Sequence, residues 1–159
     1  MVTHDPEEAM SICDKVAVMN EGKIHQIDTP INLLNSPKTI FVSSFILGNN
    51  IINLKKTGNT LLSCLGEINS SGLLKNTHIK IMSISPKFIS IKKSESGNAI
   101  VISKEFLGEF LIYKVSINDN ILRVRTNINN ILNKDDKCVL SINKNSFYFL
   151  YPGAYKVYI

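Results

Sequence analysis

The sequence has no run of about 18 apolar residues, so it offers no candidate for a membrane-spanning helix. Its first eight residues include three acidic residues and no apolar stretch, and we therefore expect no secretory leader. The three cysteines are odd in number and too widely spaced for a metal knuckle: Cys13, Cys64 and Cys138. They fit a reducing compartment, where thiols serve as small apolar residues. These absences argue against a secreted or disulfide-stapled protein.

The composition indicates a folded chain with two parts. Its 159 residues are 44% hydrophobic and 19% charged, which is typical of a domain with a real core and not of a disordered tail. The net charge of +5 is unevenly distributed, because residues 1–48 carry −3 and residues 49–159 carry +8. Gly48, Asn49 and Asn50 favour the end of a helix and a turn. We predict two domains, 1–48 and 49–159.

The first part has mixed helix and strand signals. Asp5, followed by Pro6, predicts a capped helix that runs to Cys13. Residues 16–19 and 24–27 read as two strands joined by a turn. Thr29-Pro30 and Ser36-Pro37 each place a capping hydroxyl before proline, which predicts two further helices, the second ending at Gly48.

The second part changes to short β-branched runs separated by turns. We expect strands near 51–56, 60–65, 79–84, 88–92, 98–102, 110–118, 121–125, 137–142 and 147–151. Eight or nine short strands at this spacing predict a small all-β barrel or sandwich, with an OB-like barrel as a leading candidate. The expected fold is therefore a mixed α/β segment followed by an all-β barrel.

His4 is the most informative single residue. It lies between the β-prone pair Val2-Thr3 and the helix predicted to begin at Asp5. An imidazole at such a junction can reach an anion bound nearby. From spacing alone, an ordinary surface histidine near a chain end is the simpler interpretation.

A family resemblance covers much of the chain. Three stretches, residues 2–10, 14–24 and 26–30, resemble the ATP-binding subunits of ABC-type importers, and the similarity continues through Pro37 to Asn50. It is nearly unbroken over residues 2–50. Residues 49–159 resemble more loosely the regulatory TOBE (MOP-type) barrel of that family, through Phe106-Leu107-Gly108 and the run from Lys137 to Ile142. Residues 16–50 are most similar to the iron(III)- and polyamine-type importers.

The resemblance implies a role for His4 and shows two departures. His4 would be the switch histidine, which contacts the terminal phosphate of ATP and helps position the attacking water; phosphoryl transfer needs such donors around charged oxygens. Asp5 and Glu7 would shape the helix start. Pro6 replaces the usual glutamine of the family, and Ser85-Pro86-Lys87 stands where Arg-Pro-Glu is common, so a ligand role there is not carried over.

The phosphate-binding loop of the family is absent. No Gly-x-x-x-x-Gly-Lys-Ser/Thr motif occurs, and the signature stretch, the Mg²⁺-binding carboxylate and the catalytic glutamate would all precede His4. We therefore expect a truncated, C-terminal portion that does not hydrolyse ATP alone. ATP and Mg²⁺ would belong to the complete subunit, and no metal site is expected in this chain.

The resemblance also implies partners and a location. The complete subunit would dock on membrane permeases and pair with a second ATPase subunit through the barrel. It would lie at the cytoplasmic face of the plasma membrane without entering the bilayer, and would not bind nucleic acid. It would couple ATP hydrolysis to uptake of iron(III) or of spermidine and putrescine.

The alternative hypothesis is a free-standing OB-like module that binds a small oxyanion or single-stranded nucleic acid. The +8 charge of residues 49–159 motivates it, and the basic candidates are Lys55-Lys56, Lys92-Lys93, Arg123 and Arg125. A solvated strand face is the simpler interpretation of these residues. Nucleic-acid binders add aromatic stacking platforms, but the aromatics here gather late and several should be buried: Phe147, Tyr148, Phe149, Tyr151, Tyr155 and Tyr158.

The other candidate residues give weaker indications of a functional site. His25 and His78 lack ligand partners at metal-binding spacing, and we interpret them as surface residues. Met10, Met19 and Met82 read as core residues. No serine or cysteine nucleophile motif is present.

Overall fold

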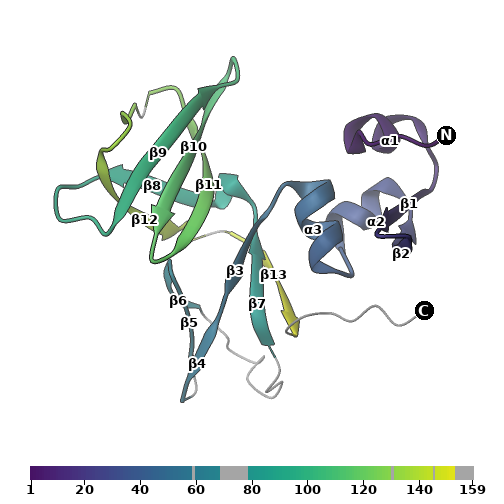
Figure 1. The fold of residues 1–159 in the computed structure, drawn as a ribbon, viewed down its shortest axis with the longest axis horizontal. Coiled ribbons are helices and arrows are strands. Elements are labelled where there is room, and N and C mark those ends of the chain that lie inside the picture. Colours follow the sequence, from purple (N-terminus) through teal and green to yellow (C-terminus); the bar gives the residue numbers. More distant parts are fainter. Residues whose placement is uncertain (59, 69–78, 130, 145, 153–159) are drawn as a thin grey trace.

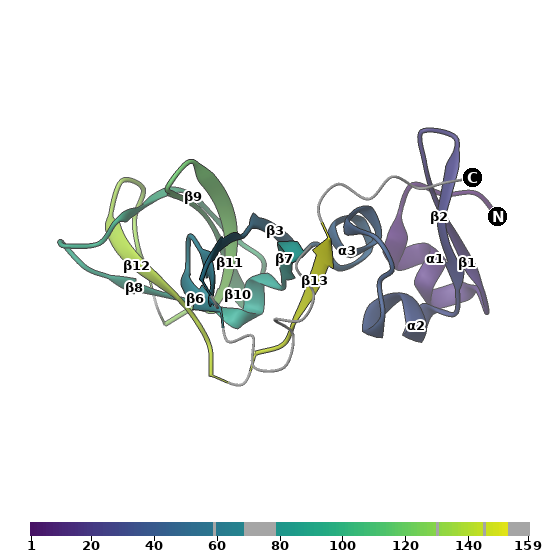
Figure 2. The same ribbon diagram turned by 90° about the horizontal axis from the view of Figure 1, so that it is seen from below.

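The computed structural model describes residues 1–58, 60–68, 79–129, 131–144 and 146–152. Helices gather at one end of the molecule and a five-stranded sheet at the other, with a three-stranded sheet between them (Figures 1 and 2). The predicted turn at 69–72, His78, Tyr155 and Tyr158 lie outside the described residues. No helix of the described part is long and apolar enough to cross a bilayer.

The N-terminal part contains three short helices and a hairpin. These are α1 (Pro6–Ile12), β1 (Val16–Asn20), β2 (Lys23–Asp28), α2 (Pro30–Asn35) and α3 (Ile40–Leu47). Val2 and Thr3, which we expected to be β-prone, form no strand. The side chains of Val18, Leu33 and Val42 form a small buried cluster, against which Met10, Val16, Phe41 and Ile46 pack.

Local capping explains most of these helix ends. The Asp5 carboxylate accepts hydrogen bonds at the start of α1, and the Thr29 hydroxyl does so for α2. Gly48 ends α3 in the left-handed conformation, with φ of 61°, as the sequence predicts. The prediction of a cap at Ser36 is wrong: Ser36 ends α2, and Thr39 caps α3 by accepting from the amide of Val42.

The C-terminal part is built almost entirely from strands, which lie in three open sheets (Figure 1). The five-stranded sheet has the order β11-β10-β9-β12-β8, and the three-stranded sheets have the orders β13-β7-β3 and β4-β5-β6. Their bounds are β3 (Asn50–Asn53), β4 (Lys55–Thr57), β5 (Thr60–Ser63), β6 (Gly66–Ile68), β7 (Ile79–Ile84), β8 (Ile89–Lys93), β9 (Ala99–Phe106), β10 (Phe110–Ile117), β11 (Asn120–Asn127), β12 (Lys137–Ile142) and β13 (Tyr148–Pro152).

The expected closed barrel is not present among the described residues. The edge strands β11 and β8 of the five-stranded sheet lie against each other, so the sheet curls strongly, but no ladder of the described part joins them. The short 3₁₀ helix η1 (Pro86–Phe88) packs on β11 just before β8 begins. Backbone in this tight turn cannot extend a strand ladder, so the sheet stays open here. A β-rich domain is observed, and an OB-like barrel is not.

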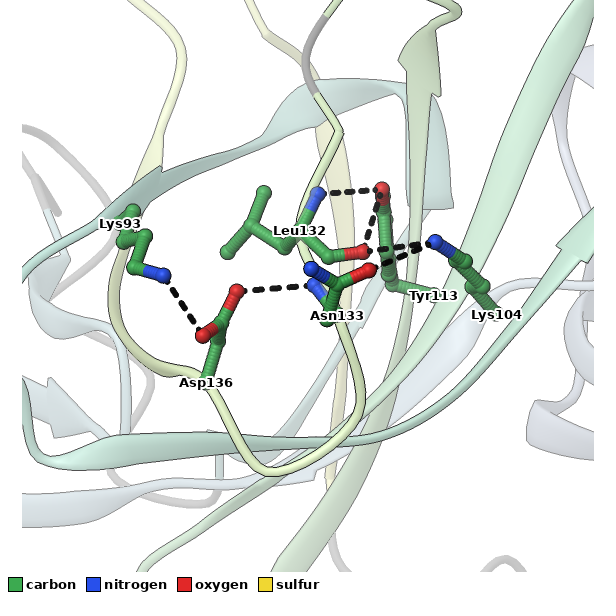
Figure 3. A network of polar contacts seen from close by, with 6 residues as sticks. All are labelled: Lys93, Lys104, Tyr113, Leu132, Asn133 and Asp136. Carbon is green, nitrogen blue, oxygen red and sulfur yellow. Dashed lines mark hydrogen bonds and ion pairs between the residues drawn. The ribbon is translucent and has the colours of Figure 1, made fainter.

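One large hydrophobic core holds the C-terminal part together. It takes side chains from all three sheets, with Ile52, Met82 and Val124 fully buried. Tyr113 and Leu132 lie in the same core and are linked, since the Tyr113 hydroxyl accepts from the amide of Leu132 at 2.9 Å (Figure 3). Burial of this apolar surface is the main stabilising term.

The connector between the two parts uses two consecutive asparagines that face in different directions. Asn50 binds the backbone of β11: its Nδ2 donates to the carbonyl of Arg123 at 2.8 Å, and its Oδ1 accepts from the Arg123 amide at 2.7 Å. Asn49 instead donates from Nδ2 to the hydroxyls of Ser43 and Ser83, at 3.2 and 3.1 Å. The helices are therefore attached to the β-domain by specific contacts; the domain boundary at residue 48 remains a prediction.

Candidate functional site

His4 lies in a bend immediately before α1, and its side chain is exposed. The hydroxyl of Thr3 accepts from the amide of Asp5 at 3.1 Å, and Asp5 Oδ1 accepts from the amides of Glu7 and Glu8 at 2.9 and 3.3 Å. These bonds fix the backbone on either side of His4. The imidazole itself has no hydrogen bond or ion pair to any described residue.

The segment around His4 borders a groove of about 700 Å³ between the chain start, α1, β1 and α3. The apolar lining comes from Met1, Val2, Pro6, Ala9, Cys13, Val16, Ala17, Val18, Met19, Phe41, Phe45 and Ile46, and the polar lining from Thr3, His4, Asp5, Lys15 and Asn20. Apart from His4, Lys15 is the only basic side chain among these described lining residues. The surface of this groove is thus mostly apolar, and few of its side chains could bind an anion.

The geometry around His4 does not by itself make a phosphate site. Binding a nucleotide phosphate requires several amide or cationic donors that converge on its oxygens. The first amides of α1 are already engaged by Asp5. The described residues also contain no group of three or more His, Cys, Asp or Glu side chains placed to hold a metal ion. In chemical terms, His4 can supply one hydrogen-bond donor, and any phosphate site that includes it would need its other donors from other residues.

The remaining candidates are distributed between core and surface. His25 is half-buried, contrary to our expectation of a surface residue: its Nδ1 lies 3.2 Å from the hydroxyl of Thr39, and its ring packs on Phe41 at 4.9 Å. Met82 is fully buried as expected, but Met19 is more than half exposed. All three cysteines are free, and burial raises the pKa of the Cys64 and Cys138 thiols.

A buried polar cluster that sequence reasoning did not predict joins the helices to the β-domain. The hydroxyls of Ser43 on α3 and Ser83 on β7 lie 2.5 Å apart, and both side chains are fully buried. The Tyr151 hydroxyl donates to the carbonyl of Pro37 at 2.9 Å. Burial raises the pKa of Tyr151, and a hydrogen bond from Ser43 partly offsets this shift. Serine and proline are common in loops, so no local pattern indicates that these four residues meet.

Several known proteins resemble the chain, although no family model matches it. The spermidine/putrescine import ATP-binding protein PotA of Trichormus variabilis is 35% identical over a 149-residue alignment, which covers 79% of this chain and 38% of that protein. PotA of a Nostoc species is 34% identical over the same shares. PotA of Bacillus anthracis is 59% identical over 51 residues, 32% of this chain.

The chain is similar to import ATP-binding proteins named for spermidine and putrescine. It spans about 38% of the length of the Trichormus and Nostoc proteins. The similarity supports the expectation of an importer ATP-binding subunit, and it supports the polyamine type. The iron(III) type gains no such support, because these three relatives are all named for polyamines.

Proposed function

We propose that this chain is the C-terminal portion of the ATP-binding subunit of a polyamine-type ABC importer. The observation that carries the proposal is the 35% identity to the Trichormus variabilis protein across 79% of the chain. That alignment is too long to be confined to either predicted part, so both parts contribute to the likeness. Residues 49–159 would then form the regulatory domain, and residues 1–48 would complete the ATPase domain.

His4 is the functional residue that the proposal assigns. It would act as the switch histidine and donate to the terminal phosphate of ATP, which is held with Mg²⁺ by the rest of the subunit. Its exposure and the lack of a hydrogen bond or ion pair to any described residue support this role, because the imidazole remains available to a ligand. Asp5 positions it by capping α1. The chain alone would not hydrolyse ATP.

The proposal also covers partners and place. The complete subunit would bind permease subunits, pair with a second ATPase subunit through the β-domain, and work at the cytoplasmic face of the plasma membrane. The exposed apolar side chains of the β1–β2 hairpin support contact with further protein: Met19, Ile24 and Ile27 are each about half exposed. A lone two-stranded sheet with an apolar outer face is a typical surface for such contact.

A chimera tests the proposal. This chain would replace the matching C-terminal part of the Trichormus variabilis protein, and spermidine uptake and ATP hydrolysis would be measured with its permeases. We expect both activities in the chimera, and we expect His4→Ala to reduce hydrolysis at least about a hundredfold, as loss of a transition-state donor does. The control is His25→Gln, which keeps a polar side chain against Thr39 and should stay active.

Two results would overturn parts of the proposal. A soluble chimera that neither hydrolyses ATP nor supports uptake would contradict the assignment of the chain. An active chimera in which His4→Ala hydrolyses ATP as fast as the parent would contradict the role of His4 alone.

A further inference from the structure

Two basic side chains face each other on the outer surface of the five-stranded sheet. Lys114 of β10 pairs directly with Arg123 of β11, and on its other side Lys114 pairs with Ser103 of β9. Both basic side chains are exposed, and their chain neighbours point into the core. Like charges directly opposite each other on antiparallel strands repel and destabilise the pair. The arrangement is therefore costly unless a negative charge neutralises it.

Among the described residues, no carboxylate lies within ion-pair distance of Lys114 or Arg123, although Glu105 borders the same hollow. The single ion pair within 4 Å in this part of the chain joins Lys93 to Asp136, away from Lys114 and Arg123. Arg125, the next basic residue along β11, is already engaged, because its guanidinium lies 3.6 Å from the centre of the Phe110 ring. Lys114 and Arg123 are thus left without an ion-pair partner among the described residues.

A hollow of about 390 Å³ opens between these side chains. Its lining consists of Ser103, Glu105, Ile112, Lys114 and Arg123. Ile112 is almost fully buried and provides an apolar wall. Ser103 adds a hydroxyl donor beside Lys114, and Glu105 adds one carboxylate further along β9, opposite Ile112. The hollow therefore contains two cationic groups, one hydroxyl and one acid.

The backbone of Arg123 is held in place by a side chain outside the hollow. Asn50 binds both the amide and the carbonyl of Arg123, at 2.7 and 2.8 Å, so the backbone position is fixed. A Cβ atom built on Gly48 would lie 3.8 Å from Nη1 of Arg123, which places the guanidinium beside the C-terminal end of α3. A fixed backbone reduces the freedom that the Arg123 side chain must lose when it binds an anion.

We propose that this hollow binds a phosphate group, as the free ion or as a monoester. Lys114 and Arg123 would donate charge-assisted hydrogen bonds to the phosphate oxygens, and the Ser103 hydroxyl would donate a third. Glu105 gives the site its selectivity. A protonated phosphate oxygen can donate to that carboxylate, but sulfate at neutral pH carries no proton and would only be repelled. The site does not depend on the proposed transport function.

Titration calorimetry on the whole chain at low ionic strength tests the proposal with inorganic phosphate and with sulfate. We expect saturable binding of phosphate and weaker binding of sulfate. Lys114→Gln and Arg123→Gln should each weaken phosphate binding at least about tenfold, since each removes a charged donor. Lys92→Gln, which removes an exposed strand lysine of β8 elsewhere on the sheet, should leave binding unchanged.

Glu105→Gln gives a second, oppositely directed test. This change should strengthen sulfate binding and reduce the preference for phosphate over sulfate, because it removes the negative charge of Glu105 that repels sulfate. Glycerol 3-phosphate distinguishes the two possible ligands. If it binds more tightly than inorganic phosphate, the ligand is a phosphate monoester; if it binds more weakly, the ligand is inorganic phosphate. Absence of saturable phosphate binding, an equal loss in Lys92→Gln, or loss of sulfate binding in Glu105→Gln would each overturn the proposal.

Discussion

Tyr151 and Pro37, 114 positions apart in the sequence, are joined by a buried hydrogen bond of 2.9 Å from the tyrosine hydroxyl to the proline carbonyl. Tyr151 lies on β13, at one edge of the three-stranded sheet, and Pro37 lies between α2 and α3. Together with Ser43 and Ser83, this pair attaches the helices to the β-domain through buried polar groups. Such groups are costly when they lose a partner, so the attachment is specific as well as stabilising.

Tyr151→Phe should lower the free energy of unfolding by about 1–3 kcal/mol at pH 7, because the buried carbonyl of Pro37 loses its donor. Urea unfolding followed by circular dichroism measures this loss. Because burial raises the folded-state pKa of Tyr151, its contribution is present below the unfolded pKa near 10 and is lost as the pH rises above it. The variant should therefore lose less stability than the parent at alkaline pH; an equal loss in both chains would contradict the assignment.

Asn50→Ala should destabilise the chain by about 1–3 kcal/mol, since both backbone groups of Arg123 lose the partners that Asn50 supplies. The matched control is Asn53→Ala on the same strand, whose side chain is exposed and should contribute less than about 0.5 kcal/mol. Thermal and urea unfolding measure the two variants side by side. Equal effects would show that the contact with β11 does not stabilise the protein.

Asp136→Asn should destabilise the chain at pH 7 by an amount that disappears in acid. Hydrogen bonds from the Asn133 amide and from Lys93 hold the pKa of Asp136 below its usual value (Figure 3). A lowered folded-state pKa gives stability that is present above the unfolded value of 3.8 and is lost as the pH falls through the folded-state pKa. Unfolding curves between pH 7 and pH 2 measure the difference.

The control for Asp136 is its neighbour. Asp135 is exposed and has a positive φ of 70°, a conformation that asparagine accepts as readily as aspartate. Asp135→Asn should therefore change the stability little at any pH. A difference between parent and Asp136→Asn that stays constant down to pH 2 would show that charge is not the source of the effect.

Hydrogen exchange should be faster in residues 5–47 than in residues 98–142. The N-terminal part buries three apolar residues in its cluster and leaves both a hairpin edge and several large apolar side chains open to water. The second range lies in the large core of the β-domain. Local opening costs less free energy where few apolar contacts must be broken. Slower exchange in residues 5–47, measured by mass spectrometry on peptides from both ranges, would be the contrary result.

The start of α3 shows where sequence prediction fails. Ser36-Pro37 and Thr39 both have the chemistry of a helix start, and local propensity does not choose between them. The tertiary structure selects Thr39, because distant groups bind the residues just before it and keep them out of the helix. Tyr151 binds the carbonyl of Pro37, and the buried side chain of Gln26 accepts from the amide of Lys38 at 2.8 Å. The helix therefore begins only at Ile40.

Of the two candidate sites, one can be found from the local sequence and the other depends on tertiary structure. His4 and its capping neighbour Asp5 can be found from the sequence, because helix capping depends on residues within one turn. The hollow between Lys114 and Arg123 cannot, although Arg123 is among the basic candidates. It depends on the register that places β10 against β11, and on Asn50, which reaches β11 from 73 positions away.

The sequence by itself determined the alternation of helix and strand, the cap at Asp5, the stop at Gly48 and the change to short strands after residue 50, since each depends on neighbouring residues. Only the tertiary structure decided the openness of the sheets, the polar attachment of the helices and the need for glycine at position 97. A Cβ atom there would lie 2.2 Å from the carbonyl oxygen of Cys138. The physical reason is the same in each case: contacts between distant segments form only when the chain packs, and no local pattern encodes their geometry.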